Sequence, residues 1–525
     1  MSATLLFSIV LVYFVVLLVV AYYTSRNSNN DTFFIGNKNS NWMLVAFGMI
    51  GTSLSGVTFV SVPGGVGDVA GNSFKGFAYM QVAIGYLIGY CVIAFVLLPL
   101  YYRLNLTSIY NYLQQRFGEV AYKTGALFFI ISRTVGATAR LYLVINILQL
   151  FILDRMGVPF VVTTAFILLM ILLYTFEGGV KTIVYTDTLQ TSLMVTGLIV
   201  CVVYILNHLN MSTGDAFASM RDQGYLNVFN TDVNSKGFFL KQILGGAFIT
   251  IAMTGLDQEM MQKNISVKRL GDSQKNVMSM ALIMTGVLFL FLTLGGLLYL
   301  FATTKGAVYT DVIVDGKLVK QLLIADPNNA GNTLNLIGDK MFPSVAMNFL
   351  PAAVSIIFII ALISALFPSA DGALTALTSS FCIDLLGLQR RTDLDEKARK
   401  RKRLTVHLSF TVIFLICILV FYIINNNSII DVILDLAGYT YGPLLGLFSF
   451  GILTKRRIPD RFIITLICLV APVISYLLAK NSAILFGGYQ IGIELLIING
   501  LLTFLGLLAI SKPAEKGVET ERAKG

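Results

Sequence analysis

The residues most able to bind a ligand lie inside long apolar stretches of the chain. One run starts at Ala46 and reads Ala-Phe-Gly-Met-Ile-Gly-Thr-Ser-Leu-Ser-Gly-Val-Thr, and another starts at Val62 and reads Val-Pro-Gly-Gly-Val-Gly. Small, polar and helix-breaking residues at this density predict a discontinuous helix, whose unwound turn frees backbone carbonyls. A bound cation can satisfy those carbonyls. The alternative interpretation is a close crossing of two helices through small residues.

A second run of this kind lies much further along the chain. It begins with Gly245-Gly246 and continues from Thr254 as Thr-Gly-Leu-Asp-Gln-Glu-Met-Met-Gln. The two candidate broken helices start near residues 42 and 238, and each would open a set of five helices. This layout is typical of an inverted repeat, in which a solute binds near the midplane between the two breaks.

Carboxylates also enter apolar segments. Asp187 sits near one end of its segment, where a solvated helix end is the alternative interpretation. Asp371, Thr375 and Thr378 share one helix face, and their oxygens are hard donors that suit Na⁺. Pro368 should weaken the backbone ladder of the same helix and expose a carbonyl. A packing face of small residues is the alternative there.

Four further charged residues fall in or near apolar segments. Asp431 and Asp435 are one helical turn apart, and Asp431 is expected at the membrane interface with Asp435 deeper. Arg133 and Arg140 are seven residues apart and share a face. They either pair with buried carboxylates or bind an anionic substrate, and structural pairing is the favoured interpretation.

The elements that must position these residues are membrane-spanning helices. The chain has 525 residues, of which 56% are hydrophobic and 13% charged, and its mean hydropathy is +0.78. This composition excludes an ordinary soluble domain and a disordered chain. The apolar segments have the length of helices rather than of barrel strands. We expect about thirteen spans, at 3–24, 42–66, 77–102, 123–152, 158–176, 185–208, 238–262, 276–304, 344–384, 404–425, 430–453, 458–479 and 486–510.

An odd number of spans places the two termini on opposite sides of the membrane. With the N-terminus outside, the predicted inner segments, which include Lys263 and the cluster at 390–403, hold most of the 38 Lys and Arg residues. The positive-inside rule therefore favours an outer N-terminus and a cytoplasmic C-terminus, in a plasma membrane. The net charge of +10 then reflects topology rather than nucleic-acid binding. The short loops favour a bacterial inner membrane, and the longest outer loops are 209–236 and 305–341.

Other chemistry finds little support in the sequence. The five Cys residues have no paired spacing and the two His residues are far apart, which argues against a disulfide framework and a zinc site. No Walker A, G-x-S-x-G or H-E-x-x-H pattern occurs. We therefore expect neither an enzyme nor an ATP-driven transporter.

Three motifs resemble the signatures of the sodium:solute symporter family. The first starts at Gly178 and reads Gly-Gly-Val-Lys-Thr-Ile-Val-Tyr-Thr-Asp-Thr-Leu-Gln; the others are Phe-Phe-Ile-Gly-Asn-Lys-Asn from Phe33 and Tyr-Gly-Pro-Leu-Leu-Gly from Tyr441. The resemblance covers nearly the whole chain, in order. The family includes sodium-coupled sugar, inositol, proline, pantothenate and sialic acid transporters.

The resemblance implies an all-α polytopic membrane protein with a five-plus-five inverted-repeat, leucine-transporter-like core that works by alternating access. The chain would then be a single transporter domain. Its parts would be a peripheral helix at 3–24, repeat one at 42–208, repeat two at 238–453, peripheral helices at 458–510 and a cytoplasmic tail at 511–525.

The resemblance also implies residues that bind sodium, which would be the coupling ion, with no organic cofactor. The main sodium site takes carbonyls of the broken helix and oxygens of the ninth span, and these positions match Gly51, Leu54, Ala365, Pro368 and Ser369. Relatives have two adjacent hydroxyls where this chain has Pro368 followed by Ser369. A second sodium site would use Asp187, with Asp371 and Gly372 at the hydroxyl positions. Asp371 would bind a cation or carry a proton, and the cation is preferred.

On the substrate side, the sugar-transporting branch of the family resembles Asp257-Gln258 and the following run to Gln262. Further contacts match Ser53 and Thr58 on the broken helix, Asp435 in the eleventh span and, loosely, Gln81 in the third. A Lys that some sugar transporters carry is absent, and Met284 stands near that position. Carboxylates suit paired bonds to vicinal hydroxyls and repel a carboxylate substrate unless they are themselves paired.

These matches favour a sodium-coupled symporter that imports a small polar organic solute, most readily a sugar or polyol. The alternatives are an amino acid, sialic acid or other organic ion as the solute, a cationic substrate, a proton-coupled transporter and a non-transporting sensor. The partners would be the solute, Na⁺ and the lipid bilayer, without nucleic acid. The solute, the number of sodium ions and the oligomeric state stay open.

Overall fold

The computed structural model describes residues 3–25, 40–67, 75–175, 179–314, 317–327, 331–388, 390, 393–424 and 429–513. The motif that starts at Phe33, the residue Gly178 and most of the tail lie outside the described residues. The side chains of 179–181 and 429–431 also lie outside them, so the expectation for Asp431 has no structural counterpart.

Helices make up most of the described chain, because apolar segments in lipid must satisfy their backbone hydrogen bonds internally. The first half contains α1 (Ala3–Ser25), α3 (Trp42–Gly64), α4 (Tyr79–Val92), η2 (Ile93–Leu97), α5 (Leu98–Arg103), α6 (Asn111–Phe117), α7 (Glu119–Leu148), η3 (Gln149–Leu153), η4 (Asp154–Met156), α8 (Phe160–Thr175), α9 (Gly179–His208) and α10 (Thr213–Asp222).

The second half contains α11 (Phe239–Thr250), η5 (Ile251–Gly255), α12 (Gln258–Ile265), α13 (Leu270–Thr304), η6 (Gly338–Lys340), α14 (Met341–Asn348), α15 (Ala352–Ser380), η7 (Phe381–Leu385), α16 (Glu396–Ile424), α17 (Ile429–Thr440), α18 (Gly442–Leu453), α19 (Ile463–Lys480), α20 (Ser482–Leu485) and α21 (Leu495–Ile510). Within the described residues, nine helices are long and apolar enough to cross a membrane, or up to eleven if each of two bent pairs is one span. Two shorter apolar helices, α8 and α21, fall where two further spans were expected.

Two expectations about local structure were wrong. The span expected at 344–384 is two helices, α14 and α15, because Pro351 caps α15 from an extended conformation and offers no backbone N–H to continue α14. The loop expected at 305–341 contains an antiparallel sheet of β1 (Val308–Val314), β2 (Lys317–Ala325) and β3 (Thr333–Asn335), in that order.

Three spans are interrupted. Helix α3 has a kink at Ser55, whose φ is 36° and ψ 167°. The chain turns by 65° between α11–η5 and α12, and by 45° between α17 and α18. The first two interruptions confirm the predicted discontinuous helices.

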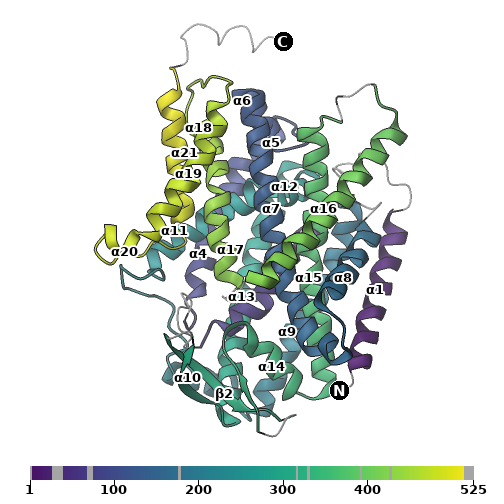
Figure 1. Cartoon of the computed structure of the whole chain (residues 1–525), viewed down its shortest axis with the longest axis vertical. Helices are drawn as coiled ribbons and strands as arrows, with labels where there is room; N and C mark the ends of the chain where they lie inside the picture. Colours follow the sequence, from purple (N-terminus) through teal and green to yellow (C-terminus); the bar gives the residue numbers. More distant parts are fainter. Residues whose placement is uncertain are drawn as a thin grey trace.

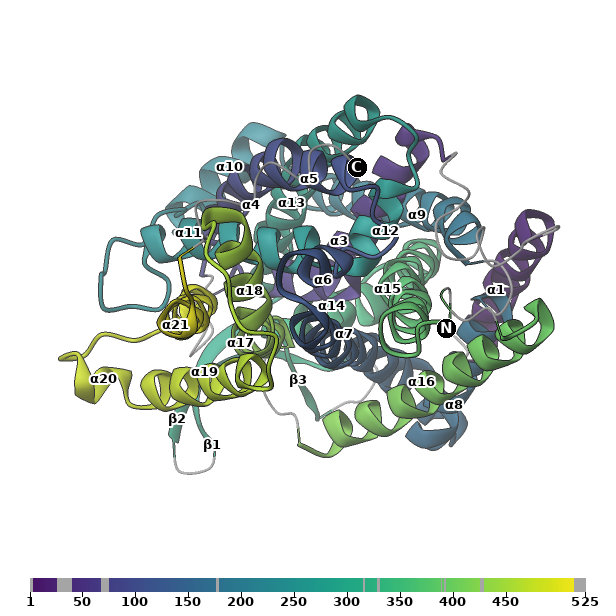
Figure 2. The same cartoon turned by 90° about the horizontal axis from the view of Figure 1, so that it is seen from above.

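Of the interrupted spans, α3 and α12 lie at the centre of the molecule, whereas α17 and α18 lie toward the side that carries α19 and α21 (Figure 2). Seen from above, α3, α12 and α15 are central, with α1, α8 and α16 on one side and α19 and α21 on the other (Figure 2). The buried share is 72% in both α3 and α15, against 28% in α1 and α16 and 22% in α19. The outer helices therefore present their apolar side chains to lipid.

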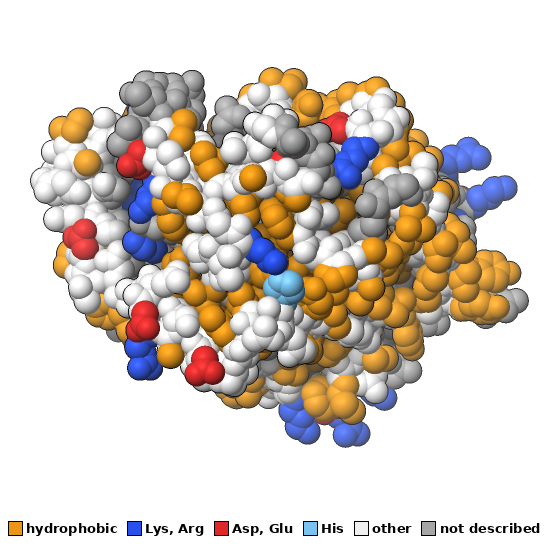
Figure 3. Space-filling view, turned by 90° about the horizontal axis from the view of Figure 1, so that it is seen from below, with side chains coloured by type: hydrophobic (Ala, Val, Ile, Leu, Met, Phe, Trp, Pro, Cys, Tyr) orange, Lys and Arg blue, Asp and Glu red, His pale blue; other side chains and the backbone are white. Residues whose placement is uncertain are grey.

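The first helix starts at the end of the molecule that carries α10, α14 and the sheet, and α21 finishes at the opposite end, near α6 (Figure 1). Charged side chains are scattered over the sheet-bearing end, with hydrophobic side chains between and around them (Figure 3). Which end faces the cytoplasm stays a prediction.

Candidate functional site

The interruption in α3 receives little support from side chains. Ser55 is buried and lies in a backbone region that residues with a side chain rarely adopt. Among the described residues, no side chain donates a hydrogen bond to the carbonyl of Gly51 or Leu54, and the hydroxyl of Ser53 has no hydrogen-bond partner. Buried polar groups are normally paired, so the Ser53 hydroxyl at this break is an oxygen that a ligand can use.

Helix α15 packs across this break. A Cβ placed on Gly51 would lie 3.5 Å from Cγ of Pro368, and one placed on Gly56 would lie 3.8 Å from the carbonyl oxygen of Ala365. The structure therefore brings the residues predicted for the main sodium site onto two facing helices. Both glycines are required by other neighbours, since a Cβ on Gly51 would clash with the Thr191 hydroxyl of α9 and one on Gly56 would clash with Cγ2 of Val144 in α7.

The oxygens available on α15 fit a small hard cation. Pro368 has no N–H, so the carbonyl of Ser364 loses its usual helical partner. The hydroxyl of Ser369 donates to the carbonyl of Leu366 at 2.9 Å, which leaves its lone pairs free to face an ion. Both residues are buried. Carbonyl and hydroxyl oxygens are the ligand type that Na⁺ shares with other hard cations.

The second interruption is satisfied by the protein itself. The Tyr101 hydroxyl donates to the carbonyl of Gly255 at 2.8 Å, and the Tyr110 hydroxyl donates to that of Leu256 at 3.0 Å. Asp257 begins α12 as its N-cap and accepts from the backbone N–H groups of Glu259 and Met260, at 2.9 and 3.3 Å. The freed backbone groups of this break are thus occupied.

Asp257 and Gln258, predicted to contact the substrate, are both buried and bound to protein groups. The other carboxylate oxygen of Asp257 accepts from the Tyr441 hydroxyl at 2.9 Å. Gln258 accepts from the backbone N–H of Ile109 at 3.0 Å. The geometry gives both residues a structural role, and their contact with a substrate stays a prediction.

Arg133 and Arg140 have different surroundings. Arg133 forms an ion pair with Glu259 and lies 3.8 Å from Asp257, so structural pairing holds for this residue. Arg140 is half-buried and has no ion pair among the described residues. It lies within electrostatic range of Arg133, Tyr441 and Asp257.

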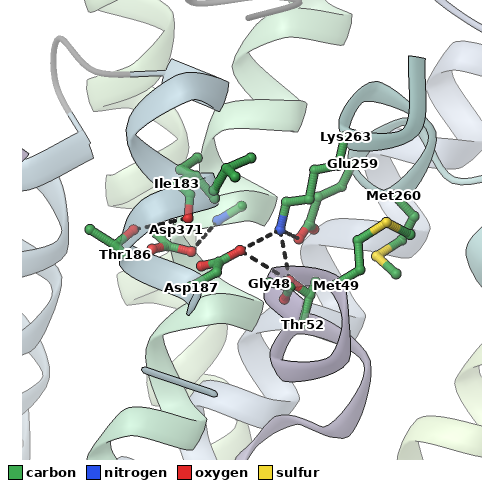
Figure 4. A network of polar contacts seen from close by, with 12 residues as sticks. Gly48, Met49, Thr52, Ile183, Thr186, Asp187, Glu259, Met260, Lys263 and Asp371 are labelled. Atoms are coloured by element: carbon green, nitrogen blue, oxygen red, sulfur yellow. Dashed lines mark hydrogen bonds and ion pairs between the residues drawn. The ribbon is translucent and has the colours of Figure 1, made fainter. Parts of the chain in front are cut away.

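Asp187 is bound by a lysine (Figure 4). The Nζ atom of Lys263 lies 2.7 Å from Oδ2 of Asp187 and 2.7 Å from the hydroxyl oxygen of Thr52. The lysine comes from α12 and was counted in the sequence as a charge of an inner segment, but it is buried. Its spacing, one helical turn after Glu259, was a signal that could have placed it on the inner face of α12.

The remaining predicted residues do not form one cluster. Asp371 accepts from the Tyr174 hydroxyl at 2.9 Å and lies within electrostatic range of Asp187. Thr58 is buried on α3, and Gln81 is buried on α4 with neither amide atom hydrogen-bonded. Asp435 is exposed on α17, within electrostatic range of Lys236, and no described contact joins it to Asp257.

Comparison with known proteins places these features in a family. The profile of the sodium:solute symporter family matches residues 33–459. The sodium/sialic acid symporter NanT of Aliivibrio fischeri is 22% identical over 490 residues, which cover 90% of this chain and 87% of that protein. Sodium-coupled monocarboxylate transporter 1 of Mus musculus is 29% identical over 244 residues, which cover 45% of this chain and 37% of that protein.

A solved structure of a Na⁺-coupled sialic acid symporter, substrate-bound and outward-open, has a TM-score of 0.76 at 18% identity, covering 97% of this chain and 99% of that one. This likeness confirms the expected fold, an all-α leucine-transporter-like core. Because the family profile matches most of the sequence, the chain belongs to the sodium:solute symporter family and is a multi-pass, sodium-coupled symporter rather than an enzyme.

Proposed function

We propose that this symporter imports an organic anion, in the first place an acidic sugar such as a sialic acid. The observation that carries this proposal is the guanidinium of Arg140, which is half-buried in the interior of a membrane protein without an ion-pair partner among the described residues. Intramembrane charges are costly and mark solute or ion pathways. A guanidinium suits a carboxylate because its N–H groups match the two oxygens.

Three of the interior carboxylates have cationic partners, which weakens their argument against an anion. A carboxylate substrate would be repelled by Asp257 and Glu259 if they were unpaired, but Arg133 contacts both. Lys263 contacts Asp187 in the same way. The objection that favoured a neutral sugar therefore weakens, and the positive charge of Arg140 remains for the solute.

The named solutes of two relatives support the same class. The protein from Aliivibrio fischeri is named for sialic acid and the one from Mus musculus for monocarboxylates. Both solutes carry a carboxylate. The hydroxyl of Ser53 and the amide of Gln81, which have no protein partner, suit the hydroxyl groups of a sugar.

We further propose that the coupling sodium binds at the break in α3, held by oxygens of Gly51, Leu54, Ala365 and Ser369, with Pro368 freeing a carbonyl beside them. An ion there would hold α3 against α15. Since binding linkage is reciprocal, sodium should tighten solute binding and solute should tighten sodium binding.

Uptake into proteoliposomes tests the proposal. Radiolabelled sialic acid, lactate, glucose and myo-inositol are supplied with an inward Na⁺ gradient and with choline in its place. We expect sodium-dependent accumulation of sialic acid, and its loss in Arg140→Gln. Arg221→Gln, on the exposed helix α10, is the matched control and should transport normally.

A neutral sugar or polyol is the second candidate, and the same assay separates the two. Accumulation of glucose or myo-inositol, with Arg140→Gln as active as the unmodified protein, would overturn the proposal of an anion and leave sodium coupling intact. Equal uptake of every compound with and without sodium would instead overturn the sodium site.

A further inference from the structure

The interior near the two broken helices contains more acidic than basic groups. Four carboxylates are at most 1% exposed, and they belong to Asp187, Asp257, Glu259 and Asp371. The basic side chains buried among them in the described structure are Arg133 and Lys263, each 3% exposed. Buried charges require partners, so the position of each cation determines which carboxylate it serves.

The ammonium of Lys263 is surrounded in the way that a bound metal cation would be. Its Nζ atom contacts oxygens from three helices: Asp187 of α9 and Thr52 of α3, each at 2.7 Å, and Glu259 of its own helix at 3.6 Å. These are a carboxylate, a hydroxyl and a second carboxylate, all turned toward one point (Figure 4). Hard oxygen donors of this kind suit an alkali cation as well as an ammonium.

Several oxygens near this point accept no hydrogen bond while the lysine is in place, although Oε1 of Glu259 keeps its ion pair with Lys263. Oδ1 of Asp187 and Oε1 of Glu259 accept no hydrogen bond, and neither does the hydroxyl of Thr191, one turn after Asp187 on α9. Helix α9 packs closely on α3 here, since a Cβ on Gly48 would lie 3.1 Å from Cβ of Asp187. If the ammonium were removed, a buried anionic pocket with several oxygen donors would be left.

We propose that Lys263 is a tethered cation that fills a monovalent-cation site formed by Asp187, Thr52 and Glu259, so that this position does not take up a free sodium ion. The inference rests on the proposed function, because it concerns how many sodium ions the symporter binds. It differs from the sequence expectation that Asp187 binds sodium itself.

The tether has a consequence for the transport cycle. A free ion leaves with the solute, whereas an ammonium that is part of α12 stays. The ammonium joins α12 to α3 and α9. A hydrogen bond from the N–H of Ser40, just before α3, to the carbonyl of Ser266, just after α12, is 3.1 Å long and also joins α3 and α12. Charge balance at Asp187 is thus kept without a further transported ion.

Equilibrium binding of radioactive sodium to the purified full chain tests this proposal. Lys263→Met removes the charge at similar volume, and we expect this variant to bind one more sodium ion per chain than the unmodified protein. Lys263→Arg keeps a charge and should leave the number unchanged. Lys241→Met, which removes a lysine at a distant contact with Glu494, is the matched control and should also leave it unchanged.

The double variant Lys263→Met/Asp187→Asn removes both charges together and should return to the sodium count of the unmodified protein. It keeps the proposal testable if Lys263→Met alone does not fold. An unchanged count in folded Lys263→Met, or a lower count in the double variant, would overturn the tethered cation. Sodium binding by the unmodified chain separates the two possible failures. If the unmodified chain binds sodium and the count in Lys263→Met is unchanged, only the inference fails. If the unmodified chain binds no sodium, the proposed function fails as well.

Discussion

The two broken helices of the core differ in the side chains that donate hydrogen bonds to the carbonyls at the break. At the break in α11–α12, the carbonyls of Gly255 and Leu256 accept hydrogen bonds from tyrosine hydroxyls, and Asp257 caps the helix that follows. At the break in α3, no described side chain donates to the carbonyl of Gly51 or Leu54. We therefore expect the second break, which side chains hold in place, to be a fixed structural joint, and the first, which lacks such support, to be the place where a ligand binds.

This difference predicts where mutations act. Changes at the second break should lower stability and leave sodium affinity alone. Changes at the first should lower sodium affinity and affect stability less. The predictions below run from the largest expected effect to the smallest.

The largest effect is expected at the ion pair of the second break. Arg133→Met leaves Glu259 and Asp257 buried without their guanidinium, and removing one partner of a buried pair typically costs about 3–5 kcal/mol. A thermal melt in detergent should show a large loss of stability. Arg133→Met/Glu259→Gln should recover part of it, and a double variant no more stable than the single one would contradict the pairing.

A smaller effect is expected from the tyrosine that satisfies the same break. Tyr110→Phe leaves the carbonyl of Leu256 without its donor, which should cost about 1–3 kcal/mol of unfolding free energy. Sodium affinity, measured by radioactive sodium binding, should stay within twofold. Tyr112→Phe is the control nearby, and weaker sodium binding in Tyr110→Phe at unchanged stability would reverse the assignment of the two breaks.

At the first break, Ser369→Ala removes one proposed sodium ligand. We expect sodium affinity to fall about tenfold, which corresponds to about 1.4 kcal/mol. Stability without sodium should change little, because the hydroxyl makes only a local bond to the carbonyl of Leu366. Ser379→Ala, further along α15 and bonded to the carbonyl of Thr375, is the control. An equal loss of affinity in both variants would remove Ser369 from the site.

The smallest effect is expected at the kink itself. Ser55→Gly relieves a backbone conformation that costs about 1 kcal/mol or more for a residue with a side chain. Its stability should therefore exceed that of Ser61→Gly, a substitution at a regular helical position of α3, by about that amount. The comparison is made by thermal melts without sodium, and a more damaging Ser55→Gly would show that the kink is not strained.

Much of the fold was accessible from the sequence, because apolar length and the density of small residues act locally. The interruptions of α3 and α11–α12 were predicted from runs such as Gly51-Thr-Ser-Leu-Ser, and most helices fall where the spans were expected, apart from the span at 344–384. The sheet at Val308–Asn335 was missed, although the alternation in Val-Tyr-Thr-Asp-Val is typical of a strand.

The site was less accessible, because it depends on which side chains meet across helices. Lys263 counts as a loop charge in the sequence, and only the turn at Asp257 directs it onto Asp187. In the same way, Asp435 was expected to lie deeper than Asp431 and to contact the substrate, but its side chain is exposed, since one helix face cannot be distinguished from another without its neighbours.

Sodium-dependent hydrogen–deuterium exchange tests the central contrast most directly. Exchange of the full chain is compared in sodium and in choline, peptide by peptide. We predict that sodium slows exchange around Ser55 in α3 and in the facing segment of α15, and leaves Gly255–Met261 unchanged. Protection of the second break, with none at the first, would contradict the account.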